Sequence, residues 1–227
     1  MQMALPRVLS VNAGFMDAAG FLALKGLFTA HVTGNFVTLG ASLVTGTSGA
    51  LAKLLALPVF CIVVILARFL GHGLRARARP VMRTLLALQF ALMTAGALLA
   101  SWLGPFPDAD GIAALMTGMT LVAAMALQNA AHRVHLASSP PSTIMTGTTT
   151  QIMLDVADLM HGLAPESAKS ARERLRHMTV SVLAFAAGCA LGALLYAWIG
   201  VWCFWVPPAL VLTTLRMQEA LAAADTR

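Results

Sequence analysis

Residues 28–38 have the sequence Phe-Thr-Ala-His-Val-Thr-Gly-Asn-Phe-Val-Thr, and residues 142–151 have the related sequence Ser-Thr-Ile-Met-Thr-Gly-Thr-Thr-Thr-Gln. Each of these two Thr-Gly phrases follows a long apolar segment that carries a carboxylate or an amide, Asp17 in the first case and Asn129 in the second. A polar break that recurs in an apolar chain is typical of an internal repeat whose two copies form one transport site.

The composition places the chain in a membrane. It is 59% hydrophobic and only 11% charged, and its apolar runs are about 20 residues long, which is the length that crosses a bilayer as a helix. The net charge of +6 comes from basic residues clustered between apolar runs, where they mark the cytoplasmic side. We therefore expect the lipid bilayer as a partner and no nucleic acid.

Eight apolar segments can be drawn, at residues 8–24, 32–44, 54–70, 82–103, 112–131, 144–160, 178–199 and 201–215. Two basic loops, at residues 75–83 and 169–176, both belong in the cytoplasm by the positive-inside rule, so an even number of crossings separates them. Three segments lie between these loops. The weakest is 144–160, because its start is rich in Thr and two aspartates lie near its end, and we predict that it is re-entrant.

The same logic makes segment 32–44 the matching re-entrant piece of the first half. The predicted fold class is an all-α integral membrane protein with six transmembrane helices plus two re-entrant half-helices, arranged as an inverted 3+3 repeat. The whole chain, 1–227, forms a single membrane domain, with repeat one at about 8–103 and repeat two at about 111–218. Both termini then lie in the cytoplasm, and the four tryptophans lie near the outer interface.

The Thr-Gly phrases are the predicted substrate site. Glycine permits the turn, and a neighbouring Thr or Asn can cap the half-helix that follows. Two half-helices that enter from opposite faces would bring their N-terminal ends together near the bilayer centre, where free N–H groups suit an anionic or carbonyl-bearing solute. The alternative is that Thr and Gly only let the helices pack closely. The predicted substrate-binding residues are Thr33, Gly34, Asn35, Asn129, Thr146, Gly147 and Thr148.

Asp17 and His31 are the predicted proton-coupling residues. Asp17 lies near the middle of the first segment, where an ionised carboxylate is costly and a functional role is the default expectation. It could exchange a proton as a cavity alternates between the two sides, or it could be a structural residue that pins two helices. His31 could be a second proton carrier or a cap beside the outer surface. Asn129, the counterpart of Asp17, cannot titrate.

Enzyme motifs are missing from the sequence. It contains no His-Glu-x-x-His pair, no paired Cys motif and no nucleophile elbow, so we expect no enzymatic activity, no cofactor and no metal site. Gly188 and Gly192 have the spacing of a close helix contact, and we expect this contact within the monomer, with a homodimer as the alternative.

Residues 14–21 (Gly-Phe-Met-Asp-Ala-Ala-Gly-Phe) and 31–35 (His-Val-Thr-Gly-Asn) resemble the first sequence block of the YoaK family of bacterial inner-membrane proteins, a domain of unknown function. The region 140–147 resembles the second block of that family, and the resemblance covers nearly the whole chain. It implies a multi-pass protein of the bacterial inner (cytoplasmic) membrane, and it supplies no substrate.

These observations predict a secondary transporter of a small polar or anionic solute, coupled to protons through Asp17. Two alternatives remain open. One is a channel with the same architecture, and the other is a structural or regulatory membrane protein that transports nothing.

Overall fold

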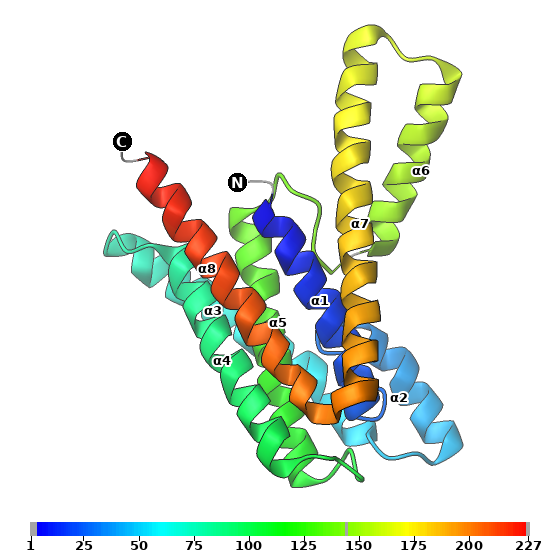
Figure 1. The fold of residues 1–227 in the computed structure, drawn as a ribbon, viewed down its shortest axis with the longest axis vertical. Helices are drawn as coiled ribbons and strands as arrows, with labels where there is room; N and C mark the ends of the chain where they lie inside the picture. The colour runs from blue at the N-terminus through cyan, green and yellow to red at the C-terminus, as the bar shows by residue number, and fades with distance from the viewer. Residues whose placement is uncertain (1–3, 144, 226–227) are drawn as a thin grey trace.

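The computed structural model describes residues 4–143 and 145–225, with side chains described up to residue 220. Within these ranges the regular secondary structure is helical (Figure 1). Its elements are α1 (Ala4–Ala23), α2 (Gly34–Thr45), α3 (Ala50–Ala76), α4 (Val81–Leu103), α5 (Ile112–His135), α6 (Met145–His161), α7 (Pro165–Ile199), the 3-10 segment η1 (Gly200–Trp205) and α8 (Val206–Asp225). The predicted segment 144–160 begins at residue 144, which lies outside the described residues.

Four stretches of the described chain are long and apolar enough to cross a membrane: α3, α4, α5 and the stretch Pro165–Ala220. The last of these contains both α7 and α8, which meet at η1 and diverge from there (Figure 1). The prediction of an all-α, multi-pass membrane protein is therefore confirmed at this level.

Two helices in the second half begin at residues other than the first residue of the corresponding apolar segment. Helix α7 begins at Pro165 instead of residue 178, because its charged first turns are good helix formers that a search for apolar residues passes over. Helix α8 begins at Val206 instead of residue 201. Its two prolines, Pro207 and Pro208, lie in the first turn, where the missing N–H groups have no partner to lose.

Helix α1 lies inside the bundle although it is not one of the four apolar stretches. Arg7, Asn12 and Asp17 lower its hydropathy, yet buried residues occur along its whole length, from Leu5 to Ala23. It packs along α7 and also contacts α8, α5 and η1. Because neighbouring helices cover α1, it can carry polar side chains that a lipid-facing helix could not.

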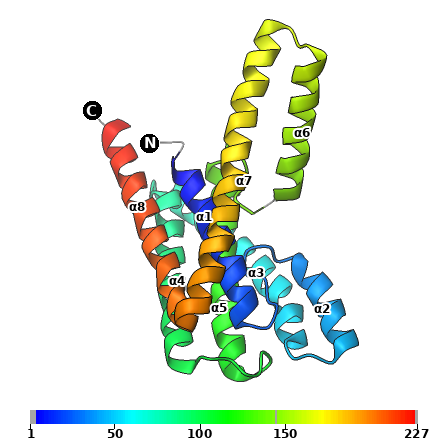
Figure 2. The same ribbon diagram turned by 45° about the vertical axis from the view of Figure 1, so that its right-hand side comes forward.

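The long helices pair in a regular way. Helix α1 packs along α7, and α3 packs along α5. The short helices α2 and α6 each lie against one long helix, α2 against α3 and α6 against α7 (Figure 2). A polar interaction supports each of the two contacts made by the short helices. Lys53 Nζ donates to Ser42 Oγ at 2.6 Å between α3 and α2, and Arg174 forms an ion pair with Asp155 between α7 and α6.

Glycines allow the closest helix contact of the fold. A Cβ added at Gly14 of α1 would collide with the carbonyl oxygen of Phe185, and one added at Gly188 of α7 would collide with the carbonyl oxygen of Val11. At Gly192 an added Cβ would lie 2.6 Å from the carbonyl oxygen of Phe15. The backbones of α1 and α7 therefore touch, and the prediction that Gly188 and Gly192 pack within the monomer is confirmed.

We predict that Gly188→Ala lowers the thermal stability of the detergent-purified protein by about 1–3 kcal/mol, the usual cost of overpacking a tight contact. The control is Gly73→Ala in α3, where an added Cβ meets nothing within 4 Å and where alanine is the better helix former. Unfolding curves followed by circular dichroism measure both variants. Equal stability of the two would show that the α1–α7 contact is looser than the structure indicates.

Candidate functional site

The carboxylate of Asp17 holds the loop that leads into α2. Its Oδ1 accepts N–H bonds from Thr29 at 3.1 Å, Ala30 at 2.7 Å and His31 at 3.1 Å. Its Oδ2 accepts a further bond from the N–H of His31 at 3.1 Å. Asp17 is only 4% exposed. A buried carboxylate is stable in this setting because three consecutive backbone amides point at it.

A second clamp closes the same loop. The N–H of Phe28 donates to Asn35 Oδ1, and Asn35 Nδ2 donates back to the carbonyl of Phe28, both at 2.8 Å. Thr33 occupies the cap position of α2 in a helix-like conformation and makes no side-chain cap bond. Of the two residues expected to cap α2, Thr33 makes no cap bond, and the side chain of Asn35 bonds to the backbone of Phe28 instead.

The backbone N–H groups that were expected to bind an anionic solute at the start of α2 already have hydrogen-bond partners within the protein. The amides of residues 29–31 hold Asp17, and those of Gly34, Asn35 and Phe36 donate to carbonyls three residues earlier at 2.9–3.2 Å. The carboxylate that sits before α2 thus belongs to the protein itself. An external anion at this position would have to displace Asp17.

The start of the second Thr-Gly phrase is held by an uncharged side chain, that of Asn129. Asn129 Oδ1 accepts a bond from Thr143 Oγ1 at 2.7 Å, and Asn129 Nδ2 donates to the carbonyl of Met125 at 3.0 Å. Asp17 to His31 and Asn129 to Thr143 both span 14 residues. In both breaks a polar side chain of the preceding helix thus accepts a bond from the residue 14 positions later, but the donor is a backbone N–H in the first and a hydroxyl in the second.

Gln128 forms the centre of a buried polar network that the sequence did not predict. Its Oε1 accepts bonds from Asn12 of α1 and Gln89 of α4, both at 2.8 Å. Its Nε2 donates to the carbonyl of Leu9 at 2.8 Å and to Ser142 Oγ at 3.3 Å. A single amide inside an apolar segment was the available signal for Asn12 and Gln89. Within the described residues, Asn12 Oδ1 and Gln89 Oε1 are buried and accept no bond.

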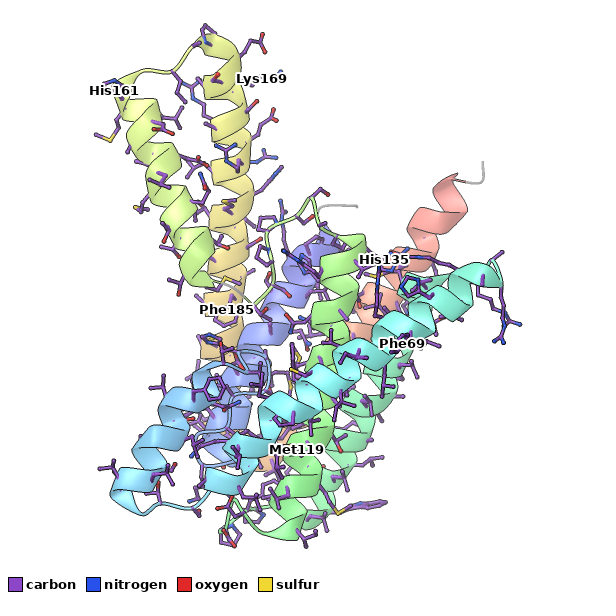
Figure 3. The ribbon with its side chains drawn as sticks, turned by 180° about the vertical axis from the view of Figure 1, so that it is seen from behind. Phe69, Met119, His135, His161, Lys169 and Phe185 are labelled. Carbon is purple, nitrogen blue, oxygen red and sulfur yellow. The ribbon has the colours of Figure 1, made fainter. Side chains whose placement is uncertain are left out.

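A cavity of about 420 Å³ lies beside Asp17 and His31. Its other walls are mostly apolar: Ala18, Phe21, Leu22, Phe28, Phe185, Cys189 and Ala193. The ring centroid of Phe28 lies 5.0 Å from that of Phe21 and 5.9 Å from that of His31. Helix α7 contributes Phe185, Cys189 and Ala193, and Phe185 is labelled in Figure 3. The cavity thus combines an aromatic lining with one carboxylate and one imidazole.

The predicted substrate-binding residues do not share this cavity. Thr33, Gly34 and Asn35 are not among its lining residues. Asn129 lines a separate cavity of about 100 Å³, and Thr146 lies on an open face of α6. Of the remaining two, Gly147 is exposed and Thr148 is buried. The structure brings together Asp17 and His31, while the substrate-binding set is spread over the two Thr-Gly phrases.

The cavity beside Asn129 contains a histidine that the sequence analysis did not single out. His132 lines it together with Ser142 and Thr143, and this side chain is only 4% exposed. Within the described residues, neither ring nitrogen of His132 has a hydrogen-bond partner. The second break therefore adjoins a small polar cavity, whereas the first adjoins a larger and mainly apolar one.

Farther along α6, Asp155 faces the basic start of α7. Arg174 Nε donates to Asp155 Oδ2 at 2.8 Å, and Arg174 Nη2 donates to Oδ1 at 2.6 Å. These hydrogen bonds hold the pKa of Asp155 below its usual range. Asp155 therefore anchors α6 to α7 through this ion pair.

Comparison with known proteins identifies a family but no activity. The profile of a family described as "Protein of unknown function (DUF1275)" matches residues 5–217. No curated protein and no solved structure matches the chain. The more specific resemblance to the YoaK family thus stays a prediction.

We predict that Gln128→Leu destabilises the protein by about 2 kcal/mol or more, since it leaves the side chains of Asn12, Gln89 and Ser142 without their shared partner. The control is Thr94→Val, which removes only a bond to the carbonyl of Phe90 in the same helix and should cost less than about 0.5 kcal/mol. Chemical or thermal unfolding in detergent measures the difference. A Gln128→Leu protein as stable as the control would exclude a structural role for the network.

Proposed function

The chain belongs to this family of unknown function, DUF1275, and we propose that it is a secondary transporter of a small polar or anionic solute. In this proposal α2 and α6 are re-entrant half-helices, and the chain crosses the bilayer six times through α1, α3, α4, α5, α7 and α8. The solute occupies the cavity beside Asp17 and His31, at the first Thr-Gly phrase, and Asp17 couples solute movement to protons.

The lengths and directions of the short helices support the re-entrant arrangement. Helix α2 has 12 residues and α6 has 17, which at 1.5 Å per residue is less than the roughly 30 Å of a bilayer core. They extend toward opposite ends of the bundle (Figure 1). Each is preceded by a polar loop that is fastened to the helix before it.

The observation that carries the proposal is the equivalence of the two halves. The repeats match α1 with α5, α2 with α6 and α3 with α7. In this matching the α1–α7 contact corresponds to the α5–α3 contact, and the α2–α3 contact corresponds to the α6–α7 contact. The same correspondence matches position 17 with 129 and position 31 with 143, and each pair is joined by a hydrogen bond, from a backbone N–H in the first pair and from a hydroxyl in the second. Inverted repeats of this kind, with broken helices at the centre, are a recurrent design of secondary transporters.

The distribution of tryptophans and basic residues over the two ends of the bundle supports one orientation of the chain in the membrane. The four tryptophans lie in the last turn of α4, the last turn of α7 and η1, and Trp205 Nε1 donates to Ser101 Oγ at 3.0 Å across this end. The basic residues 75–83, around the turn between α3 and α4, lie at the other end (Figure 1). The predicted basic loop 169–176 also lies at that end, but it forms early turns of α7 and not a loop. An aromatic belt outside and basic residues inside would place both termini in the cytoplasm of a bacterial inner membrane.

We predict that cysteines introduced by Thr47→Cys and Ser138→Cys are labelled from opposite sides of the membrane. Both positions are exposed, one in the loop before α3 and one in the loop after α5. The background lacks the natural thiols, with Cys61, Cys189 and Cys203 changed to alanine. A membrane-impermeant maleimide should label position 47 in intact cells, and position 138 only after permeabilisation. Labelling of both in intact cells would contradict the inverted arrangement.

The contacts of Asp17 support a coupling mechanism. A protonated carboxyl is a poorer acceptor than a carboxylate, so protonation would weaken the bonds from the amides of residues 29–31. His31 belongs both to this bonded loop and to the cavity wall. Protonation of Asp17 would thus loosen the segment that starts α2 and reshape the cavity at the same time.

The cavity supports a small solute. Its volume of about 420 Å³ is in the usual range for small-molecule sites. Its aromatic and aliphatic walls fit the carbon skeleton of the solute, and the His31 imidazole is the group placed to meet a carbonyl or an anion. The solute class that fits best is therefore a small molecule with one polar or anionic end.

We predict that Asp17→Asn lowers the rate of solute-driven proton movement by at least about 10-fold, while solute exchange continues. The assay uses proteoliposomes with an internal pH-sensitive dye and a panel of radiolabelled amino acids, sugars and dicarboxylates. The matched control is Asp110→Asn, because Asp110 also accepts backbone N–H bonds, from Gly49 at 2.8 Å and Ala52 at 3.1 Å, but lies outside the cavity. Proton movement that persists in Asp17→Asn, or that disappears equally in the control, would refute the coupling.

A second candidate function has one observation in its favour. The carboxylate of Asp17 is fully engaged inside the protein, which is also what a structural or regulatory membrane protein would need. In that case no solute of the panel crosses, and Asp17→Asn lowers thermal stability without changing any flux.

A further inference from the structure

A groove lies between α3, α4 and α5 at the basic end of the bundle, away from the two Thr-Gly phrases. It encloses about 150 Å³. Its walls are aliphatic or small: Val64, Ala67, Gly71, Val81, Leu85, Ala130 and Val134. All three helices that form it are among those apolar enough to cross a membrane.

Basic side chains complete the lining of this groove. They are Arg68 and Arg75 from α3 and Arg133 and His135 from α5. The ion pairs among the described residues, Arg83 with Glu219 and Arg174 with Asp155, involve none of them, and no acidic residue lines the groove. His135 Nε2 is buried, and within the described chain it has no hydrogen-bond partner. The rim of the groove therefore carries three exposed arginines that form no ion pair among the described residues.

We propose that this groove binds an anionic phospholipid, with the phosphate among Arg68, Arg75 and Arg133 and an acyl chain along the aliphatic walls. Basic pockets between transmembrane helices on the cytoplasmic side are suited to anionic head groups. Guanidinium groups match phosphate oxygens in charge and in geometry. The proposal does not depend on transport.

The surroundings favour a lipid over a dissolved anion. The walls of the groove are almost entirely apolar, and a free phosphate gains nothing from such walls. The neighbouring surface of α3 exposes large apolar side chains, with Leu66 at 59% and Phe69 at 69%. Figure 3 shows His135 at the end of α5, beside the part of α3 that carries Phe69. The basic rim thus adjoins a surface that lipid tails would cover.

The test is native mass spectrometry of the full-length protein in neutral detergent, titrated with phosphatidylglycerol or phosphatidylcholine. We expect one phosphatidylglycerol to bind at least about 10-fold more tightly than phosphatidylcholine. The triple variant Arg68→Gln, Arg75→Gln, Arg133→Gln should weaken phosphatidylglycerol binding about 100-fold. The matched control removes the same charge at exposed arginines outside the groove, by Arg77→Gln, Arg79→Gln and Arg172→Gln, and should change the affinity less than about 3-fold.

A second variant guards against misfolding of the first. Arg75→Glu changes one exposed side chain near the end of α3, and it should weaken phosphatidylglycerol binding more than about 10-fold. Equal losses in the triple variant and its control would mean that net charge alone attracts the lipid, which would overturn the proposal. Equal affinity for the two lipids would also overturn it, as would full displacement of phosphatidylglycerol by millimolar inorganic phosphate.

Discussion

A backbone amide that leaves a helix inside a bilayer finds no water there and must bond within the protein. In this chain the loops before α2 and α6 are each held by buried or half-buried polar side chains of the helix that precedes them. The carboxylate of Asp17 collects three amides before α2, and Asn129 and Gln128 hold the hydroxyls that precede α6. Because α1 carries Asp17 and Asn12, it has to be enclosed, and α7 touches its backbone at Gly14 and Gly188.

The general plan of the fold could be predicted from the sequence. Positive-inside parity and the Thr-Gly phrases placed short segments at 32–44 and 144–160, and the structure has α2 at Gly34–Thr45 and α6 at Met145–His161. These features depend on local composition and on charge counting. The start of α7 could not be found in the same way, because its first turns are polar, and a helix that leaves an apolar environment has no apolar pattern to follow.

The contacts of the site were harder to foresee than its residues. Asp17 stood out as a carboxylate in an apolar segment, but its partners are backbone amides, and every residue type supplies an amide. Gln128 gathers groups from α1, α4 and the loop before α6, so its role depends on which helices become neighbours. The sequence also predicted that the two phrases meet, whereas their residues line different cavities. These contacts and cavities depend on how helices far apart in the sequence pack together.

The glycine contact between α1 and α7 has a mechanical consequence. Where two backbones touch without side chains between them, a change of rotamers cannot let the helices slide past each other. Rotation of one helix relative to the other, about the point of contact, would still be possible. Among the described elements α6 packs on α7 alone, so it would swing with α7 as one rigid piece, while Asp17 stays with α1. Gly14 and Gly188 would then be the pivot of this rotation. The part of the second Thr-Gly phrase inside α6 would move with α7, while Ser142 and Thr143 stay bonded to α5.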